Sequence, residues 1–323
     1  MEGLKIYGKE DIMALTSLRE GETKFGERVQ VISALEQLKA STARFVLLGI
    51  PEDIGVRANQ GIGGAATAWI PALKALLNTQ STSFLTGSEL LVLGHFHFQE
   101  PAESDIQALQ GAVVQIDEQV YPVIREIIEA GKVPIVIGGG HNNAYPIIKG
   151  LSLALQKPID VLNIDAHADL RPANGRHSGN GFSYAIKNGF LRKYAIFGLH
   201  QNYNNTGILE QISENPNIDA LFFDDLLKNN QPLPEQLQPL LKNLANETGL
   251  EIDLDCIENL LSSAFTPSGF NINEIRRIIL SMEKKLAYMH LCEGAVLLND
   301  GRQSAGTAKA IAYLVTDFIK AQK

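Results

Sequence analysis

The 323-residue sequence contains only two cysteines, Cys256 and Cys292, so it offers no disulfide framework. It also lacks a long hydrophobic run and an N-terminal basic segment followed by an apolar one, which are the marks of membrane spans and secretion signals. We therefore expect a cytoplasmic protein that does not bind a membrane and whose two thiols are reduced and buried.

Basic residues are also scarce, with 28 Lys and Arg against 36 Asp and Glu and a net charge of -8. Nucleic-acid binding depends on clustered Lys and Arg that neutralise phosphates, so nucleic acid is not an expected partner. The hydrophobic content of 45% is enough to bury a substantial core, and no linker divides the chain. We predict a single domain over residues 1–323, with residues 1–43 as an N-terminal extension packed on it.

Apolar segments typical of buried strands recur along the chain and alternate with segments of helical periodicity. The strand-like segments are 45–50, 90–93, 133–137, 160–164, 194–199, 218–223, 249–254 and 287–291. The helical segments are 65–78, 105–130, 143–156, 234–246, 271–286 and 303–321. Alternating strands and helices predict an α/β fold with three α/β/α layers around a central, mostly parallel sheet of about eight strands.

Acidic and histidine side chains directly follow three of these strand-like segments. They are His141 in GGGH, Asp165, His167 and Asp169 in DAHAD, and Asp253 and Asp255 in DLD. Side chains two residues apart on an extended strand point to the same side, so each cluster can face one ligand. In parallel sheets, ligands bind beyond the carboxyl ends of the strands, which is where all three clusters fall.

Four buried carboxylates need positive charge, because desolvation and mutual repulsion would otherwise destabilise them severely. Arg171 is the only Lys or Arg close to these clusters in the sequence, whereas two divalent cations would balance four negative charges. A single Asp-x-Asp pair at a strand end is usually a helix cap or loop anchor. Three such clusters together favour a two-metal site, and ligand softness alone leaves manganese, iron, zinc and magnesium open.

The segments GGGH, DAHAD and DLD, in this order, resemble those of the arginase, or ureohydrolase, superfamily of binuclear manganese enzymes. PEDIGVRAN at 51–59, DLRP at 169–172, HSG at 177–179 and HLCEGA at 290–295 are more similar to formimidoylglutamases than to arginases or agmatinases. The resemblance implies an arginase-like fold, two manganese ions per subunit and hydrolysis of a linear amidine C–N bond.

Roles for individual residues follow from the same resemblance. One ion would bind His141, Asp165, Asp169 and Asp253, and the other would bind Asp165, His167, Asp253 and Asp255. Asp169 would also carry a proton to the leaving amine, and Glu293 in HLCEGA would orient the cationic amidine through charge-assisted hydrogen bonds. The alternative for Glu293 is an ordinary helix-capping or surface acid.

The substrate contacts are expected in the loop that follows DAHAD. N-formimino-L-glutamate carries two carboxylates, and a guanidinium can grip a carboxylate with two hydrogen bonds. Arg171 and Arg176 are therefore candidates, with Arg57 on an earlier loop as a third. Ser178 and Asn180 are further candidates, and His177 is either a proton shuttle or a donor within the loop.

The resemblance therefore implies a manganese-dependent hydrolase of N-formimino-L-glutamate that acts in histidine degradation. One alternative is another ureohydrolase, such as an agmatinase, arginase or guanidinobutyrase. A second alternative is a family member that binds metal without turnover. The resemblance also implies a homo-oligomer, either a trimer or a hexamer.

Overall fold

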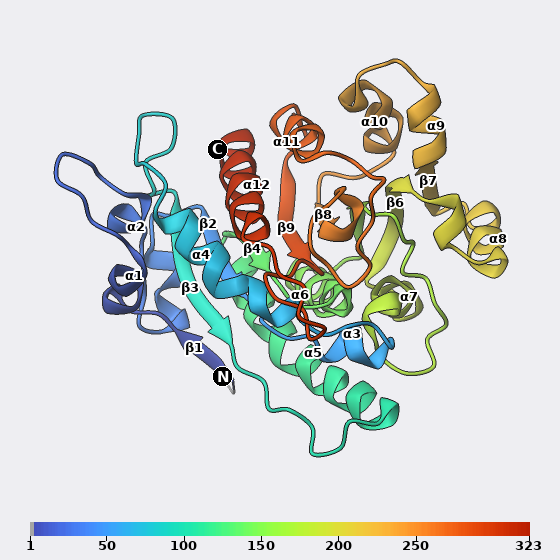
Figure 1. The fold of residues 1–323 in the computed structure, drawn as a ribbon, viewed down its shortest axis with the longest axis horizontal. Coiled ribbons are helices and arrows are strands. Elements are labelled where there is room, and N and C mark those ends of the chain that lie inside the picture. The colour runs from blue at the N-terminus through green and yellow to red at the C-terminus, as the bar shows by residue number, and fades with distance from the viewer. Residues whose placement is uncertain (1–2) are drawn as a thin grey trace.

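The computed structural model describes residues 3–323, which form a sheet of nine strands with helices on both faces (Figure 1). The strand order across the sheet is β1-β3-β2-β4-β9-β8-β5-β6-β7. The bounds are β1 (Leu4–Ile6), β2 (Phe45–Gly49), β3 (Leu90–Phe96), β4 (Val133–Ile137), β5 (Ile159–Ile164), β6 (Leu191–Leu199), β7 (Ile218–Phe222), β8 (Thr248–Asp253) and β9 (Leu286–Cys292). All neighbouring pairs are parallel except β1 and β3.

The predicted α/β class, the parallel sheet and all eight predicted strands are confirmed. The strand that sequence analysis missed is β1, which lies antiparallel at the sheet edge inside the expected extension 1–43. It has only three residues, with Lys5 exposed in the middle, and such a short segment gives almost no periodic signal. Residues 1 and 2 of that extension lie outside the described part of the chain.

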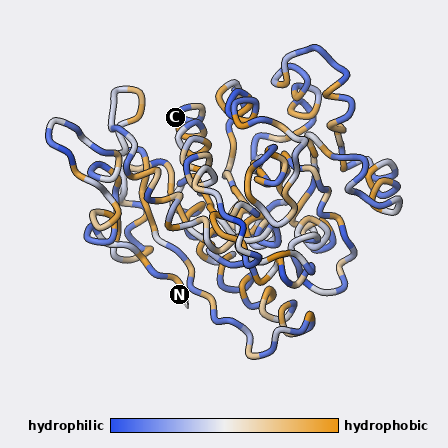
Figure 2. The backbone as a smooth tube through the Cα atoms, in the orientation of Figure 1, coloured by the Kyte–Doolittle hydropathy of each residue, from blue (hydrophilic) through white to orange (hydrophobic). Residues whose placement is uncertain are grey.

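The two faces of the sheet bury alternate side chains of the same strand. Phe45 and Leu47 of β2 pack into one core, whereas Val46 and Leu48 pack into the other. This alternation is what a parallel sheet covered on both faces requires. Figure 2 shows hydrophobic residues on the central strands and a mixture of hydrophobic and hydrophilic residues along the covering helices.

Twelve α-helices are present within residues 3–323. The first core includes residues of α1 (Lys9–Leu15), α2 (Phe25–Arg28), α4 (Trp69–Leu77), α9 (Phe223–Lys228), α10 (Leu233–Lys242), α11 (Ile272–Leu280) and α12 (Gly306–Gln322). The second core includes residues of α3 (Ile54–Ala58), α5 (Ile106–Glu129), α6 (Ala144–Leu155), α7 (Gly181–Lys187) and α8 (Thr206–Glu214). The three-layer arrangement is therefore confirmed.

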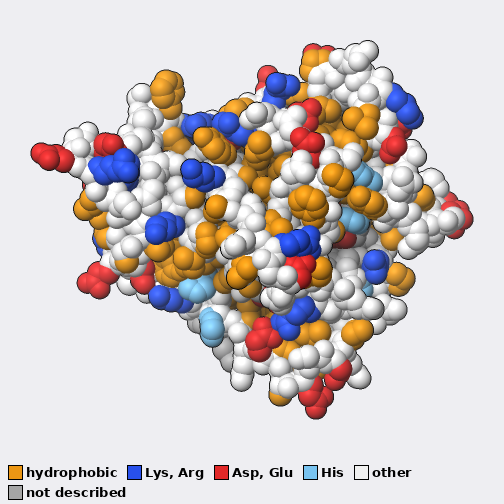
Figure 3. All heavy atoms as spheres, in the orientation of Figure 1, with side chains coloured by type: hydrophobic (Ala, Val, Ile, Leu, Met, Phe, Trp, Pro, Cys, Tyr) orange, Lys and Arg blue, Asp and Glu red, His pale blue; other side chains and the backbone are white. Residues whose placement is uncertain are grey.

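No helix within residues 3–323 is both long and apolar enough to cross a membrane. On the face drawn in Figure 3, Lys and Arg side chains are interspersed with Asp and Glu rather than gathered into one basic patch.

Candidate metal centre

The site lies at the carboxyl ends of four strands that are neighbours in the middle of the sheet, β4, β9, β8 and β5. His141 follows β4 in a 3-10 turn over residues 141–143, and Asp165 directly follows β5. Asp253 is the last residue of β8, and Asp255 lies in the short turn Leu254–Cys256. The parallel topology thus brings together ligand candidates that are more than a hundred positions apart in the sequence.

A tight backbone turn presents His141 to the site. Gly139 has φ +80°, and a Cβ atom there would overlap the side chain of Asn143 and approach Glu52. The buried carboxylate of Glu52 accepts hydrogen bonds from the backbone N–H of Gly140 at 3.0 Å and from Asn143 Nδ2 at 2.6 Å. Its other oxygen accepts from the N–H of Gly55 at 3.1 Å. Glu52 therefore ties the start of α3 to the His141 turn.

Sequence reasoning missed this role of Glu52. The only signal was an acid immediately after the apolar segment 45–50, in a position that would otherwise suggest an exposed loop.

Three carboxylates converge on one nitrogen of His141. His141 Nδ1 lies 2.9 Å from Asp169 Oδ2, 3.2 Å from Asp165 Oδ2 and 3.3 Å from Asp253 Oδ2. These four residues form one compact group of potential metal ligands. His141 and Asp165 are fully buried, so solvent does little to screen the interaction between them.

A second group of potential ligands shares Asp165 with the first and adds His167 and Asp255. His167 Nδ1 lies 3.1 Å from Asp255 Oδ2 and 3.6 Å from Asp165 Oδ1. All six predicted ligand candidates therefore lie together. Asp253 belongs to the first group only, although the resemblance implies that it bridges both ions.

Several buried polar atoms of these groups have no hydrogen-bond partner among residues 3–323. They are both ring nitrogens of His141 and Oδ1 of Asp255. Burial, reinforced by repulsion from Asp255 and Asp165, raises the pKa of Asp253 well above its ordinary value. Cations would bind the lone pairs of such unpaired nitrogen and oxygen atoms and would offset the repulsion between the carboxylates, so the residues fit two divalent ions.

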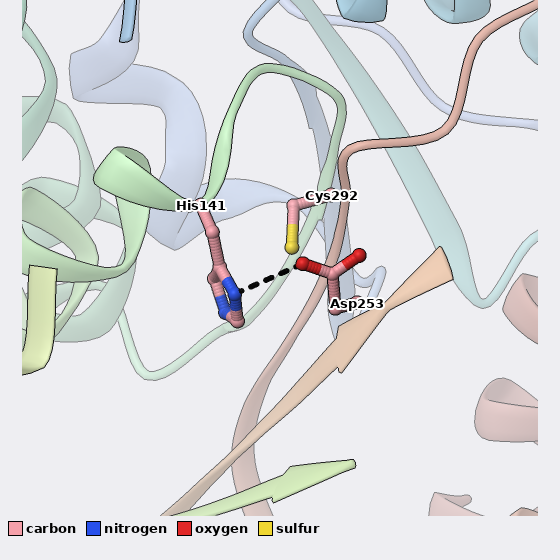
Figure 4. A group of neighbouring side chains, drawn as sticks. All are labelled: His141, Asp253 and Cys292. Carbon is pink, nitrogen blue, oxygen red and sulfur yellow. Dashed lines mark ion pairs between the residues drawn. The ribbon is translucent and has the colours of Figure 1, made fainter. Parts of the chain in front are cut away.

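A thiol lies beside these ligands. His141, Asp253 and Cys292 point toward one another from three separate elements (Figure 4). Burial raises the pKa of the Cys292 thiol well above its ordinary value, so the sulfur keeps its proton and is a poor metal ligand. The effective donors are carboxylates and imidazoles, which suit a hard or borderline divalent ion.

Asp169 and Glu293 both adopt left-handed backbone conformations that are unusual for residues with a Cβ. Their φ angles are +50° and +61°. Glu293 Oε1 accepts a hydrogen bond from the N–H of His141 at 2.9 Å. Burial, together with repulsion from Asp255 and Asp169, raises the pKa of Glu293 to about 8. Such strain and such a pKa are typical of functional positions.

A cavity of about 190 Å³ opens onto the metal ligands. It is lined by Val56, Asn59, Gly61, His167, Asp169, Arg171, Ser178, Tyr203, Asn204, Ile208, Asp253, Asp255, Ser263, Ala264 and Glu293. A larger cavity of about 450 Å³ lies between α4 and α12, but no acid or histidine lines it. The smaller cavity is therefore the candidate active-site cavity, because acidic and histidine side chains line it.

Two of the predicted substrate contacts line this cavity. Arg171 has an exposed side chain at the rim, and the buried Ser178 accepts a hydrogen bond from Asn59 Nδ2 at 3.2 Å. Tyr203 also lines the cavity and stacks on the His167 ring with centroids 5.4 Å apart. Sequence reasoning missed both Asn59 and Tyr203, although Asn59 ends the family-like segment 51–59.

The expectation that Arg176 and Asn180 grip the substrate is not supported by their contacts. Arg176 is buried, and its Nε donates to Asp117 Oδ2 at 2.7 Å. Its Nη1 donates to Asn180 Oδ1 at 2.9 Å, and its Nη2 donates to the carbonyl of Asn142 at 2.8 Å. With its donors engaged inside the protein, Arg176 supports the loop, and neither it nor Asn180 lines the cavity.

Arg57 and His177 also lie outside the cavity lining. Arg57 pairs with Asp53 at 2.7 Å and with Glu100 at 2.7 Å, so its guanidinium is already occupied. His177 Nδ1 accepts a hydrogen bond from the N–H of Gly179 at 3.2 Å, so this ring nitrogen acts within the loop as an acceptor and not as the expected donor.

The fold and these clusters define an α/β enzyme whose acids and histidines can hold metal ions. The model of the arginase family matches residues 43–319, and the chain belongs to that family. It is a hydrolase that acts on amidine C–N bonds.

The similar proteins include several formimidoylglutamases. One from Paraburkholderia xenovorans (strain LB400) is 27% identical over 291 residues, which cover 83% of this chain and 86% of that protein. One from Streptococcus pyogenes serotype M3 (strain SSI-1) is 29% identical over 223 residues, covering 66% of this chain and 64% of that protein.

Among solved structures, formimidoylglutamase from Bacillus subtilis subsp. subtilis str. 168 has a TM-score of 0.76 and 16% identity, covering 94% of this chain and 93% of that one. Trypanosoma cruzi formiminoglutamase with Mn²⁺ has a TM-score of 0.72 and 18% identity, covering 93% and 98%. At these identities the likeness establishes the arginase-like fold.

Proposed function

We propose that the protein hydrolyses N-formimino-L-glutamate to L-glutamate and formamide, with two manganese ions per subunit, as a step of histidine degradation. The observation that carries this proposal is the presence of the Arg171 guanidinium in the same cavity as Asp169 and Glu293. A cation at the rim suits a substrate that bears carboxylates, whereas agmatine bears none. The formimidoylglutamases among the similar proteins support the same choice.

The residues that would hold the ions are the six that the sequence singled out. His141, Asp165, Asp169 and Asp253 would hold one ion, and Asp165, His167, Asp253 and Asp255 would hold the other, as the family resemblance implies. The two groups of neighbouring side chains support this assignment for every ligand except Asp253 at the second ion. When bound, two such ions supply the positive charge that activates a water near neutral pH.

Glu293 is proposed to hold the amidine of the substrate. Its Oε1 accepts a hydrogen bond from the N–H of His141, which fixes the carboxyl group, and the residue lines the cavity. A cationic amidine would favour the ionised form of Glu293 and so form charge-assisted hydrogen bonds with it. Asp169, also at the cavity, is proposed to carry a proton to the leaving amine.

Arg171 is proposed to bind a carboxylate of the glutamate portion. Its backbone N–H donates to the carbonyl of Gly179 at 3.0 Å, which joins two distant parts of the loop after β5. Ser178 and Asn59, already hydrogen-bonded to each other, supply neutral donors at the same wall. We further propose a cytoplasmic homo-oligomer, a trimer or hexamer, without nucleic-acid or membrane partners.

The test is activity after manganese reconstitution, measured side by side on N-formimino-L-glutamate, arginine, agmatine and guanidinobutyrate. Glutamate and formamide from the first substrate alone are the expected products. Urea from any of the others would replace the substrate assignment by another ureohydrolase activity. Stable manganese binding without turnover of any of the four would instead favour the non-catalytic family member.

A further inference from the structure

A second carboxylate lies behind His141, on the side away from the metal ligands. Glu251 Oε2 is 3.5 Å from His141 Nε2, the ring nitrogen opposite the one that the three aspartates approach. Glu251 is fully buried and lies two residues before Asp253 on β8, so both side chains project from the same face of the strand. Asp253 meets one nitrogen of the His141 ring, and Glu251 faces the other.

Two side chains of the neighbouring strand anchor Glu251. The Tyr288 hydroxyl donates to Glu251 Oε1 at 2.7 Å, and His290 Nδ1 lies 2.6 Å from Glu251 Oε2. Glu251 and His290 are direct partners in the pairing of β8 with β9. All three side chains are fully buried, so the network is rigid and screened from water.

The far nitrogen of His290 completes the connection to the His141 turn. His290 Nε2 lies 3.3 Å from the carbonyl oxygen of Gly138, which precedes Gly139 in that turn. A carbonyl can only accept, so this nitrogen carries a proton. The carboxyl oxygens of Glu251 can accept hydrogen bonds, so Glu251 can serve as the acceptor for a protonated ring nitrogen.

We infer that Glu251, anchored by His290 and Tyr288, is a positioning residue that holds a proton on Nε2 of His141 and thereby presents Nδ1 to the metal ion. His141 Nε2 is a buried polar atom without a hydrogen-bond partner among residues 3–323. The carboxyl oxygen that it faces, at 3.5 Å, belongs to Glu251. A carboxylate behind a metal-ligating histidine fixes its tautomer and ring orientation, and removing it weakens the metal site. The inference rests on the metal assignment of the proposed function.

The test measures manganese affinity of protein prepared without metal, by isothermal titration and by electron paramagnetic resonance of free manganese. Glu251→Gln keeps the shape but replaces the carboxyl group with an amide, so one of the two ions should bind about 10- to 100-fold more weakly. Ser152→Ala is the control, because it removes a buried hydrogen bond at the end of α6, to the carbonyl of Lys157, far from the site. That variant should bind both ions as the wild type does.

A double-mutant cycle distinguishes an effect of Glu251 on manganese binding through His141 from a general structural effect of the substitution. If Glu251 acts through the imidazole, adding Glu251→Gln to His141→Asn should weaken binding no further. Equal weakening in both backgrounds would overturn the inference, as would wild-type affinity in folded Glu251→Gln.

If Glu251→Gln does not fold, manganese affinity is measured in Tyr288→Phe and His290→Gln instead. Each of these variants keeps the Glu251 carboxyl group and removes one of its two contacts with β9. Weakened binding of one ion is then expected, and wild-type affinity in both variants would overturn the inference. Failure of the wild type itself to bind two ions would instead remove the metal assignment of the proposed function.

Discussion

Arg171 and Arg176 lie five positions apart in one loop, yet their surroundings give them different roles. Arg171 is exposed at the rim of the cavity, whereas Arg176 is buried against Asp117. An arginine with free donors beside the metal ligands can bind an anionic substrate. An arginine whose donors are already engaged inside the protein stabilises the loop that carries the first one.

Substitution of Arg171 by Ala should raise the KM for N-formimino-L-glutamate with little change in kcat. A charged hydrogen bond contributes about 1.5–3 kcal/mol, which corresponds to a roughly 10- to 100-fold rise in KM. Steady-state kinetics with manganese-loaded protein measure it. Arg57→Ala is the matched control, because that guanidinium is held by Asp53 and Glu100 outside the cavity lining. An unchanged KM in Arg171→Ala would remove this residue from the substrate site.

Tyr203 covers one face of a metal-ligand candidate. Its ring stacks on His167 at an interplanar angle of 15° and continues to His200, with centroids 5.0 Å apart. Aromatic pairs of this kind contribute about 0.5–1.5 kcal/mol, so Tyr203→Ala should weaken manganese binding about 2- to 10-fold. Tyr203→Phe keeps the ring and should bind manganese normally in the same titration. Weakening in both variants would implicate the hydroxyl group instead.

His177 should make the metal-free protein less stable in mild acid. Burial, followed by the charges of Arg171 and Arg176, lowers the pKa of His177 from 6.5 to about 4. Above pH 6.5 the folded and unfolded forms are both neutral at this residue, so it has no effect on stability there. As the pH falls from 6.5 to 4, the unfolded chain binds the proton first and stability is lost.

The measurement is urea unfolding of metal-free protein between pH 7 and 4. His177→Gln should lose less stability than the wild type over that window, whereas the same change at the exposed His97 should leave the wild-type slope. Parallel slopes for His177→Gln and the wild type would contradict the assignment.

A buried ion pair between Arg176 and Asp117 attaches the loop after β5 to helix α5. Replacing Asp117 by Asn should lower the free energy of unfolding by about 3–5 kcal/mol, because it leaves the Arg176 charge buried without its partner. Urea denaturation measures the loss. The double variant Asp117→Leu with Arg176→Met should recover much of it, since no buried charge remains. A single variant as stable as the wild type would show that the pair does not fasten the loop.

The same pair shows where sequence reasoning reaches its limit. The eight apolar strands and the clusters at their ends could be predicted, because strand periodicity and ligand spacing are local properties. The partner of Arg176 is 59 positions earlier on α5, so nothing near Arg176 in the sequence reveals that it is buried. Glu251 was overlooked for a related reason, although its spacing from Asp253 places both on one face of β8.

The topology of the whole sheet places several negatively charged side chains close together at one site. Four central strands end at the site, where the carboxylates of Asp165, Asp169, Asp253 and Asp255 lie close to two histidines. Folding without metal must therefore work against desolvation and repulsion of these groups. Cations that bind the folded form but not the unfolded chain would relieve this cost.

The thermal midpoint should therefore rise with manganese concentration. At a hundredfold excess over the dissociation constant, one bound ion stabilises the folded form by about 2.7 kcal/mol, which corresponds to a shift of several degrees. Calorimetric scans with manganese and with a chelator measure the shift. Asp165→Asn should lose most of it, because Asp165 belongs to both ligand groups, whereas Ser152→Ala should keep it. An equal shift in wild type and Asp165→Asn would mean that manganese stabilises the protein at some other place, because only binding at the paired clusters depends on Asp165.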